Sequence, residues 1–122
     1  MAAPNIVNVT SIYGRTRGQD LTTSTTAGIL TCASDKVLKV NSIIIANIDG
    51  SSSADVTVSF YDSSQSAAHS LASTVTVPAD STLVVLGKDS PIYLEESDEI
   101  RGGASANGDL EVVISYEELD DA

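Results

Sequence analysis

Apolar and polar residues alternate with a period of two in several segments of this chain, and no other feature constrains its fold as strongly. The alternation runs through residues 56–60, 71–77 and 110–116, and each segment has one apolar face. Such segments form strands of a sheet that packs on one side. Helical periodicity is scarce, so the sequence predicts an all-β fold, with a short helix at 64–71 as an open alternative for that segment.

Residues 37–48 differ because they are apolar on both faces around Ile43, Ile44 and Ile45. A strand inside a sheet with both faces covered has this pattern. We expect a long central strand here, covered on its second face by the N-terminal segment or by a neighbouring subunit. Shorter strands are predicted at 83–86 and 92–94, and another around Ile100.

Turn signals separate these strands at intervals of roughly ten residues, which is typical of sandwiches and jelly rolls. Residues 78–80 contain a proline that ends a strand, and Asn107-Gly108 predicts a type I′ hairpin. A chain of 122 residues suits one domain. The sequence thus predicts a single-domain antiparallel β-sandwich, jelly-roll-like, with an aliphatic core because there is no Trp and one Phe.

Charge is divided unevenly along the chain. Residues 1–48 hold four basic and two acidic side chains, a net charge of +2, whereas residues 49–122 hold two basic and fifteen acidic ones, a net charge of −13; together they give the −11 of the whole chain. Residues 1–25 are also rich in Thr and Gly and too polar to form a core alone. We therefore divide the chain into an extended N-terminal arm, 1–25, and a β-sandwich domain, 26–122.

The arm carries apolar side chains that a free tail seldom keeps. We interpret it as a segment that becomes ordered on a neighbouring subunit, while a flexible tail or a first edge strand is the alternative. The acidic residues at 117–121 are either solvated or meet the arm of a neighbour. The candidate partner-binding residues of the arm are Ile6, Val9, Ile12, Tyr13, Arg15 and Arg17.

No set of residues predicts catalysis. His69 is the one histidine, and no G-x-S-x-G elbow accompanies it. The single cysteine, Cys32, lies in an apolar stretch and excludes an internal disulfide. The acidic residues of 95–99 suit a solvated turn, with a bound divalent cation as the alternative. We predict no catalytic residue, no metal site and no cofactor.

The strongly negative charge repels phosphates, so we expect no nucleic acid as a partner. No stretch approaches the eighteen apolar residues of a membrane helix, so no membrane is expected either. The start of the chain lacks the pattern of a secretory signal, and we expect synthesis in the cytosol.

Several sequence segments of the chain resemble segments of small virion structural proteins of tailed bacteriophages, particularly marine and cyanobacterial ones. The opening MAAPNIVNVTSIYG is one, and the likeness covers nearly the whole chain. The others are VNSIIIAN with ADVTV, VPADSTL, YLEESDEI, and residues 110–118. The resemblance implies a non-enzymatic particle component without a cofactor.

From this resemblance we expect a capsid decoration (cement) protein of the virion, assembled in the host cytoplasm. Its partners would be the major capsid protein or other virion proteins, and the chain would form a homo-oligomer. One alternative is a tail, neck or fibre-associated protein that contacts the host surface. The other is a hydrolase of the host envelope, which would use His69 or Glu99.

Overall fold

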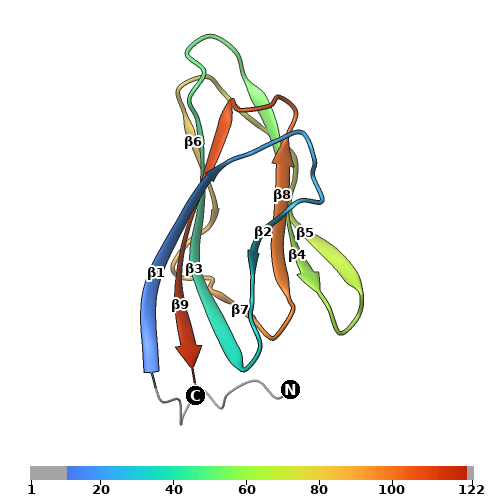
Figure 1. The fold of residues 1–122 in the computed structure, drawn as a ribbon. Coiled ribbons are helices and arrows are strands. Elements are labelled where there is room, and N and C mark those ends of the chain that lie inside the picture. The colour runs from blue at the N-terminus through green and yellow to red at the C-terminus, as the bar shows by residue number, and fades with distance from the viewer. Residues whose placement is uncertain (1–10, 121–122) are drawn as a thin grey trace.

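The structure, a computed structural model, describes residues 11–120, and this part of the chain is all-β without a helix. It contains nine strands (Figure 1). Their bounds are β1 Ser11–Asp20, β2 Gly28–Thr31, β3 Lys36–Asn47, β4 Ala54–Asp62, β5 Ala67–Val77, β6 Thr82–Leu86, β7 Ile92–Leu94, β8 Glu99–Ala104 and β9 Leu110–Asp120. The same residues include no helix of the length and apolarity that crossing a membrane requires.

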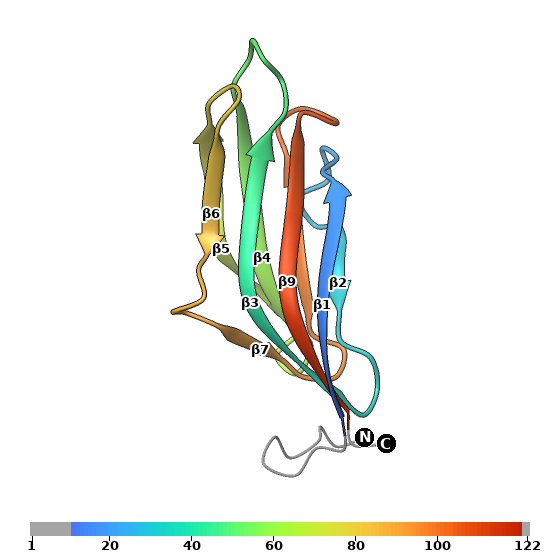
Figure 2. The same ribbon diagram turned by 90° about the vertical axis from the view of Figure 1, so that its left-hand side faces the viewer.

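The strands form two antiparallel sheets that face each other (Figure 2). The five-stranded sheet has the order β1-β9-β3-β6, and the short β7 also pairs with β3. The four-stranded sheet has the order β2-β8-β4-β5. Every pairing is antiparallel, so each sheet can bury one face and leave the other to solvent.

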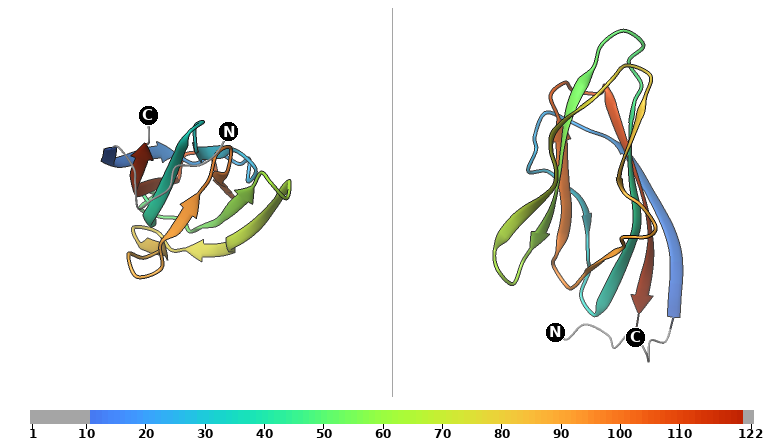
Figure 3. Two further views of the ribbon diagram at one scale, coloured as in Figure 1. Left: turned by 90° about the horizontal axis from the view of Figure 1, so that it is seen from below. Right: turned by 180° about the vertical axis from the view of Figure 1, so that it is seen from behind.

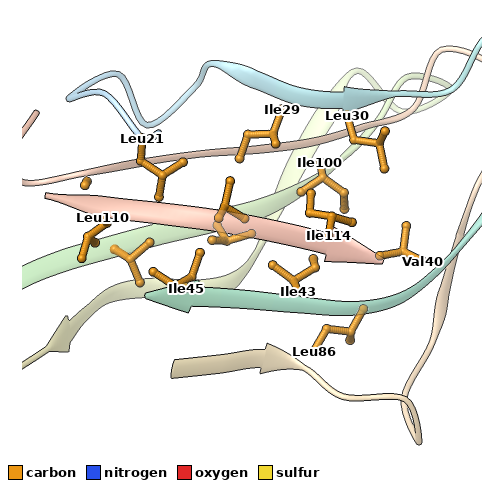
Figure 4. Packing of buried hydrophobic residues seen from close by; sticks show 14 of the residues in the cluster. Leu21, Ile29, Leu30, Val40, Ile43, Ile45, Leu86, Ile100, Leu110 and Ile114 are labelled. Atoms are coloured by element: carbon orange, nitrogen blue, oxygen red, sulfur yellow. The ribbon is translucent and has the colours of Figure 1, made fainter. Parts of the chain in front are cut away.

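The core lies between the two sheets and is aliphatic, as the composition predicted. Figure 4 shows Ile43, Ile45 and Ile114 of the five-stranded sheet facing Ile29 and Ile100 of the other. All five side chains are at most 3% exposed. On β9 the inward residues Leu110, Val112 and Ile114 recur at every second position, and this explains the period-two pattern of that segment in the sequence.

The long apolar segment at 37–48 is a central strand, as predicted, because β3 lies between β9 and β6. Ile43 and Ile45 point into the core, and Ile44 between them lies on the outer face. Ile44 is opposite Val113 of β9 and Val84 of β6, which are 42% and 59% exposed. The outer face therefore carries a short apolar row across three strands.

The structure excludes one local alternative and contradicts one local prediction. The segment 64–71 is not a helix, because the chain turns at 63–66 and pairs with β4 from Ala67 onward. Asn107-Gly108 is not a two-residue hairpin, because β8 and β9 belong to different sheets. Gly108 alone of the pair has a positive φ, at 84°, whereas a type I′ turn needs both residues there.

The segment between β1 and β2 crosses from one sheet to the other and is held against β8. Ala104 N donates to the carbonyl of Thr22 at 2.8 Å, and Gly102 N donates to that of Ala27 at 3.0 Å. A side chain at Gly103 would collide with the backbone of Ser24. The absence of a Cβ at Gly103 therefore lets the connection lie directly on the strand.

The N-terminal segment enters the fold earlier than the predicted arm boundary at residue 25. Residues 11–20 form β1, which pairs with β9 at the margin of the sheet (Figure 3). Leu21, which is 1% exposed, belongs to the core. The first-edge-strand alternative thus describes residues 11–20, while Ile6 and Val9 lie outside the described residues.

Candidate functional site

The basic residues of the predicted arm lie on β1, the edge strand of the five-stranded sheet. Its register with β9 is unbroken from Ser11 opposite Asp120 to Asp20 opposite Glu111. Within residues 11–120, no strand pairs with the other side of β1. A sheet edge of this kind presents unpaired backbone N–H and C=O groups that another strand can use.

The other edge strands are shorter or irregular. β2 has four residues and β6 has five. β5 is long, but its register with β4 shifts twice, and Thr74 has a φ of 52° while its N–H donates to Thr57 Oγ1 at 3.1 Å. Bulges and short strands protect edges against pairing. Among the described strands, β1 is thus the long, regular edge.

Two of the predicted apolar residues are exposed on β1. Ile12 is 58% exposed and lies opposite Leu119 of β9, and Tyr13 is 46% exposed and lies opposite Glu118. Because successive residues of a strand alternate between faces, the two side chains lie on opposite faces of the sheet. Their position at the start of β1 places them beside the basic part of the strand.

The two predicted arginines have different surroundings. Arg15 Nε lies 3.3 Å from Glu118 Oε1, and its guanidinium lies 5.3 Å from the centre of the Tyr13 ring. Arg17 Nη2 donates to Gln19 Oε1 at 3.1 Å, and no carboxylate of the described residues forms an ion pair with it. An open concavity of about 440 Å³ lies along residues 14–18 and Tyr116. Its walls are polar and basic.

Sequence reasoning missed an ion-pair cluster next to β1. Lys36 of β3 lies 2.6 Å from Asp120 and 3.6 Å from Glu118, and the hydrogen bond with Asp120 raises the pKa of Lys36. The C-terminal acidic residues were expected to be solvated or to meet a neighbouring subunit, yet Glu118 pairs with Arg15 and Lys36 of its own chain. In the sequence, opposite charge was the one sign that these residues could pair. Their contact depends on the register of β1, β9 and β3, which the sequence does not give.

The reactive side chains considered in the sequence are not assembled into a catalytic site. His69 is exposed on β5, and its ring lies 3.3 Å from Gln65 Oε1. Cys32 is buried and donates to the carbonyl of Lys36 at 3.2 Å. Burial raises the pKa of the Cys32 thiol to about 11. A thiol in this state is a weak nucleophile near neutral pH.

Of the acidic residues at 95–99, Asp98 stabilises turns next to β4 and β8, and Glu99 is the first residue of β8. Asp98 is 5% exposed and accepts hydrogen bonds from Ser63 N and Glu95 N, both at 3.0 Å. Glu99 pairs with Arg101 at 2.9 Å, and the Arg101 guanidinium lies over the ring of Tyr61. In the described part of the chain, no three His, Cys, Asp or Glu side chains form a group that could hold a metal ion.

A second hollow, of about 260 Å³, lies where the β1–β2 connection meets β4, β5 and β8. It is lined by Thr23, Thr25, Asp55, Thr57, Thr74, Ala104 and Ser105. The Asp55 carboxylate there accepts from Thr76 Oγ1 at 2.7 Å. Sequence reasoning could not find this hollow, because its residues come from separate segments of ordinary composition.

Comparisons of the chain with protein-family models, with curated proteins and with solved structures find no match. A function is therefore proposed from the chain's own residues and from the resemblance of its sequence to virion structural proteins of tailed bacteriophages.

Proposed function

We propose that this chain is a non-enzymatic structural protein of a tailed-bacteriophage virion, and specifically a capsid decoration, or cement, protein. The observation that supports this role best is β1, a long exposed edge strand with two arginines on an otherwise acidic body. Such an edge is suited to attachment, since it offers backbone groups, exposed apolar side chains and a local positive charge at one place. The partner would be the major capsid protein or another virion protein.

The strand order supports a jelly-roll description of the body. When the short β7 is set aside, eight strands remain, and the first, eighth, third and sixth of them form one sheet. The second, seventh, fourth and fifth form the other sheet. We propose from this order that the body is a jelly roll of two Greek keys, a fold found in viral capsid and lectin domains. A shared fold is an analogy and does not by itself determine a function.

In this proposal, the N-terminal arm and β1 dock together on the shell. Ile6 and Val9 of the arm and Ile12 and Tyr13 of β1 would bury apolar area, at roughly 25 cal/mol per Å² before ordering costs. Arg15 and Arg17 would meet acidic groups of the partner. Several copies, or a homo-oligomer, would make weak single contacts sufficient through multivalency.

The experiment that tests this role is a count of the chain in purified particles by mass spectrometry and its location by cryo-EM. Hundreds of copies on the shell are expected for a decoration protein. A few copies at the neck or tail would support a tail, neck or fibre protein instead, and absence from the particle would contradict both.

A binding assay tests the attachment surface. Particles that lack the protein are incubated with the full chain or with a variant that carries Arg15→Glu and Arg17→Glu. We expect the double variant to fold and to lose binding. Lys88→Glu, a single charge reversal on the exposed turn between β6 and β7, is the control for charge away from β1, and it should bind as the parent does.

A further inference from the structure

The backbone groups that β1 leaves unpaired can be assigned from the hydrogen bonds at the end of the strand. Leu21 N donates to Leu110 O, and Ile48 N donates to Asp109 O. In an antiparallel ladder, opposite residues alternate between bonded and non-bonded pairs. The backbone groups of the even-numbered residues of β9 therefore form hydrogen bonds with β1, and those of the odd-numbered residues form hydrogen bonds with β3. On β1, the N–H and C=O groups of Ile12, Gly14, Thr16 and Gly18 consequently face away from β9.

The side chains of β1 divide into two kinds by face. Arg15 and Arg17 are two residues apart, so they share a face, and Gly14, Thr16 and Gly18 lie on the other. Between Gly14 and Gly18, a strand that pairs with this edge would therefore meet two cations on one face and only the Thr16 side chain on the other. Carboxylates at alternate positions of the incoming strand would match this arrangement.

Arg17 is the stronger anchor of the two arginines. Its guanidinium has five donors, of which Gln19 Oε1 takes one, and it has no ion-pair partner within the described residues. Arg15 already contacts Glu118. A carboxylate that reaches Arg17 would form a new charge-assisted hydrogen bond, the stronger class of such bonds.

A second copy of β1 does not match this edge. Two copies would have to pair through the same outward residues, and the longest overlaps are centred on Arg15 or on Thr16. The first sets Arg15 opposite Arg15 of the other copy, and the second sets Arg15 opposite Arg17. Like charges directly opposite each other destabilise a strand pair. The arginines therefore disfavour self-pairing and favour an acidic strand.

We propose that β1 extends its sheet by accepting an extended segment of a partner protein, with Asp or Glu at alternate positions facing Arg15 and Arg17 and small residues between them. This is recognition by β-strand addition, in which the main chain provides affinity and side chains provide specificity. The inference rests on the proposed function and defines the chemistry of its docking surface.

The test uses the full chain and a blocked peptide of alternating Glu and Thr, as long as β1. Calorimetry should detect saturable binding, with heteronuclear NMR shift changes concentrated on β1. A peptide of equal composition with its Glu residues in adjacent pairs, and an alternating peptide with every second amide N-methylated, should both bind about tenfold or more weakly. Equal binding by either control would overturn the proposal, and so would no binding of the alternating peptide at about 1 mM.

Protein variants distinguish peptide binding at the β1 edge from binding caused by the overall charge of the molecule. Arg17→Glu should weaken peptide binding about tenfold or more, whereas Lys88→Glu should leave it within about twofold. Thr16→Pro removes an outward N–H, which proline tolerates at a strand edge, and should fold yet lose binding. A dimer in solution that pairs β1 with β1 would contradict the proposal that an acidic segment of a partner protein pairs with this edge. Peptide binding by a protein absent from virions would refute the virion role and leave strand addition standing.

Discussion

Arg15 of β1 and Glu118 of β9 form an ion pair within one chain, with Nε and Oε1 3.3 Å apart. Glu118 also lies 3.6 Å from Lys36 Nζ, so one carboxylate is shared by cations from two different strands. The pair links the edge strand to its neighbour and partly neutralises Arg15. Arg17 lies two residues further along and has no such partner in the described part of the chain.

Glu118→Gln should strengthen binding of the alternating acidic peptide. The change frees Arg15 and removes a negative charge beside the docking edge, so we expect a gain of about two- to fivefold in affinity, measured by calorimetry. Loss of a partly exposed ion pair should change the free energy of unfolding by about 1 kcal/mol or less. Glu95→Gln, in the exposed turn between β7 and β8, provides the same change of charge. Weaker binding by Glu118→Gln would contradict the role assigned to Arg15.

Asn47→Ala should lower the free energy of unfolding by about 1–3 kcal/mol, because three backbone groups lose a hydrogen-bond partner and one of them, the Val77 carbonyl, is buried. Asn47 is 3% exposed, and its side-chain amide donates to Ser52 O at 3.0 Å and to Val77 O at 2.9 Å. Its oxygen accepts from Asp49 N at 2.9 Å. Denaturant unfolding measures the loss.

Asn47→Asp is the informative companion to that variant. The aspartate has almost the same shape and keeps the acceptor for Asp49 N, but it cannot donate to the two carbonyls. We expect it to be at least as destabilising as Asn47→Ala at pH 7, since a buried charge would face two carbonyl oxygens. A variant as stable as the parent would show that these hydrogen bonds contribute little.

The strands could be predicted because each one buries side chains on the face that points into the core, and this leaves a pattern in its own segment of the sequence. Val56 and Val58 of β4, and Ile43 and Ile45 of β3, reveal this in the sequence alone. The wrong hairpin prediction and the excluded helix both concern segments where local conformational preference and strand pairing conflict. Asn107-Gly108 specifies a turn but cannot specify whether the next strand returns to the same sheet. Residues 64–71 have helix-compatible side chains, but pairing with β4 keeps them extended from Ala67 onward.

The sequence allowed us to predict which residues belong to the candidate site, but not how these residues are arranged in space. The positions of Arg15 and Arg17 in the sequence indicated a basic segment, and their two-residue spacing places them on one face of a strand. The contact of Arg15 with Glu118 depends on the β1–β9 register, which joins segments from opposite ends of the chain. Opposite charges in the two segments suggested attraction, but could not distinguish a contact within one chain from one between subunits.

Gly103→Ala should lower the free energy of unfolding by about 1–3 kcal/mol through overpacking. A Cβ at Gly103 would collide with the backbone of Ser24 and would lie 2.9 Å from Thr22 O. The backbone of the β1–β2 connection would have to move off β8. Gly14→Ala is the control, because a Cβ there has no atom within 4 Å and should change stability by about 0.5 kcal/mol or less. Thermal unfolding of the two variants compares them directly, and equal stability would contradict the close approach.

The pairing of β1 with β9 within the chain should become less stable as the pH rises above the ordinary pKa of glutamate, about 4.3. Glu111 of β9 lies opposite Asp20 of β1, and a hydrogen bond with the Asp20 carboxyl raises the pKa of Glu111. A carboxyl whose folded-state pKa lies above its unfolded-state value stabilises the fold while it is protonated. This contribution is complete below the unfolded-state pKa and is lost as the pH rises through the folded-state pKa.

Glu111→Gln tests this dependence, because its amide can donate to Asp20 at any pH. We expect the variant to gain stability over the parent at pH 7 and to gain less or none at pH 4, measured by denaturant unfolding at both values. Glu95→Gln makes the same change of charge in an exposed turn and should not show this difference between the two pH values. If the two variants respond alike, repulsion across the whole acidic surface, and not the contact between Glu111 and Asp20, controls the pH dependence of the edge strand.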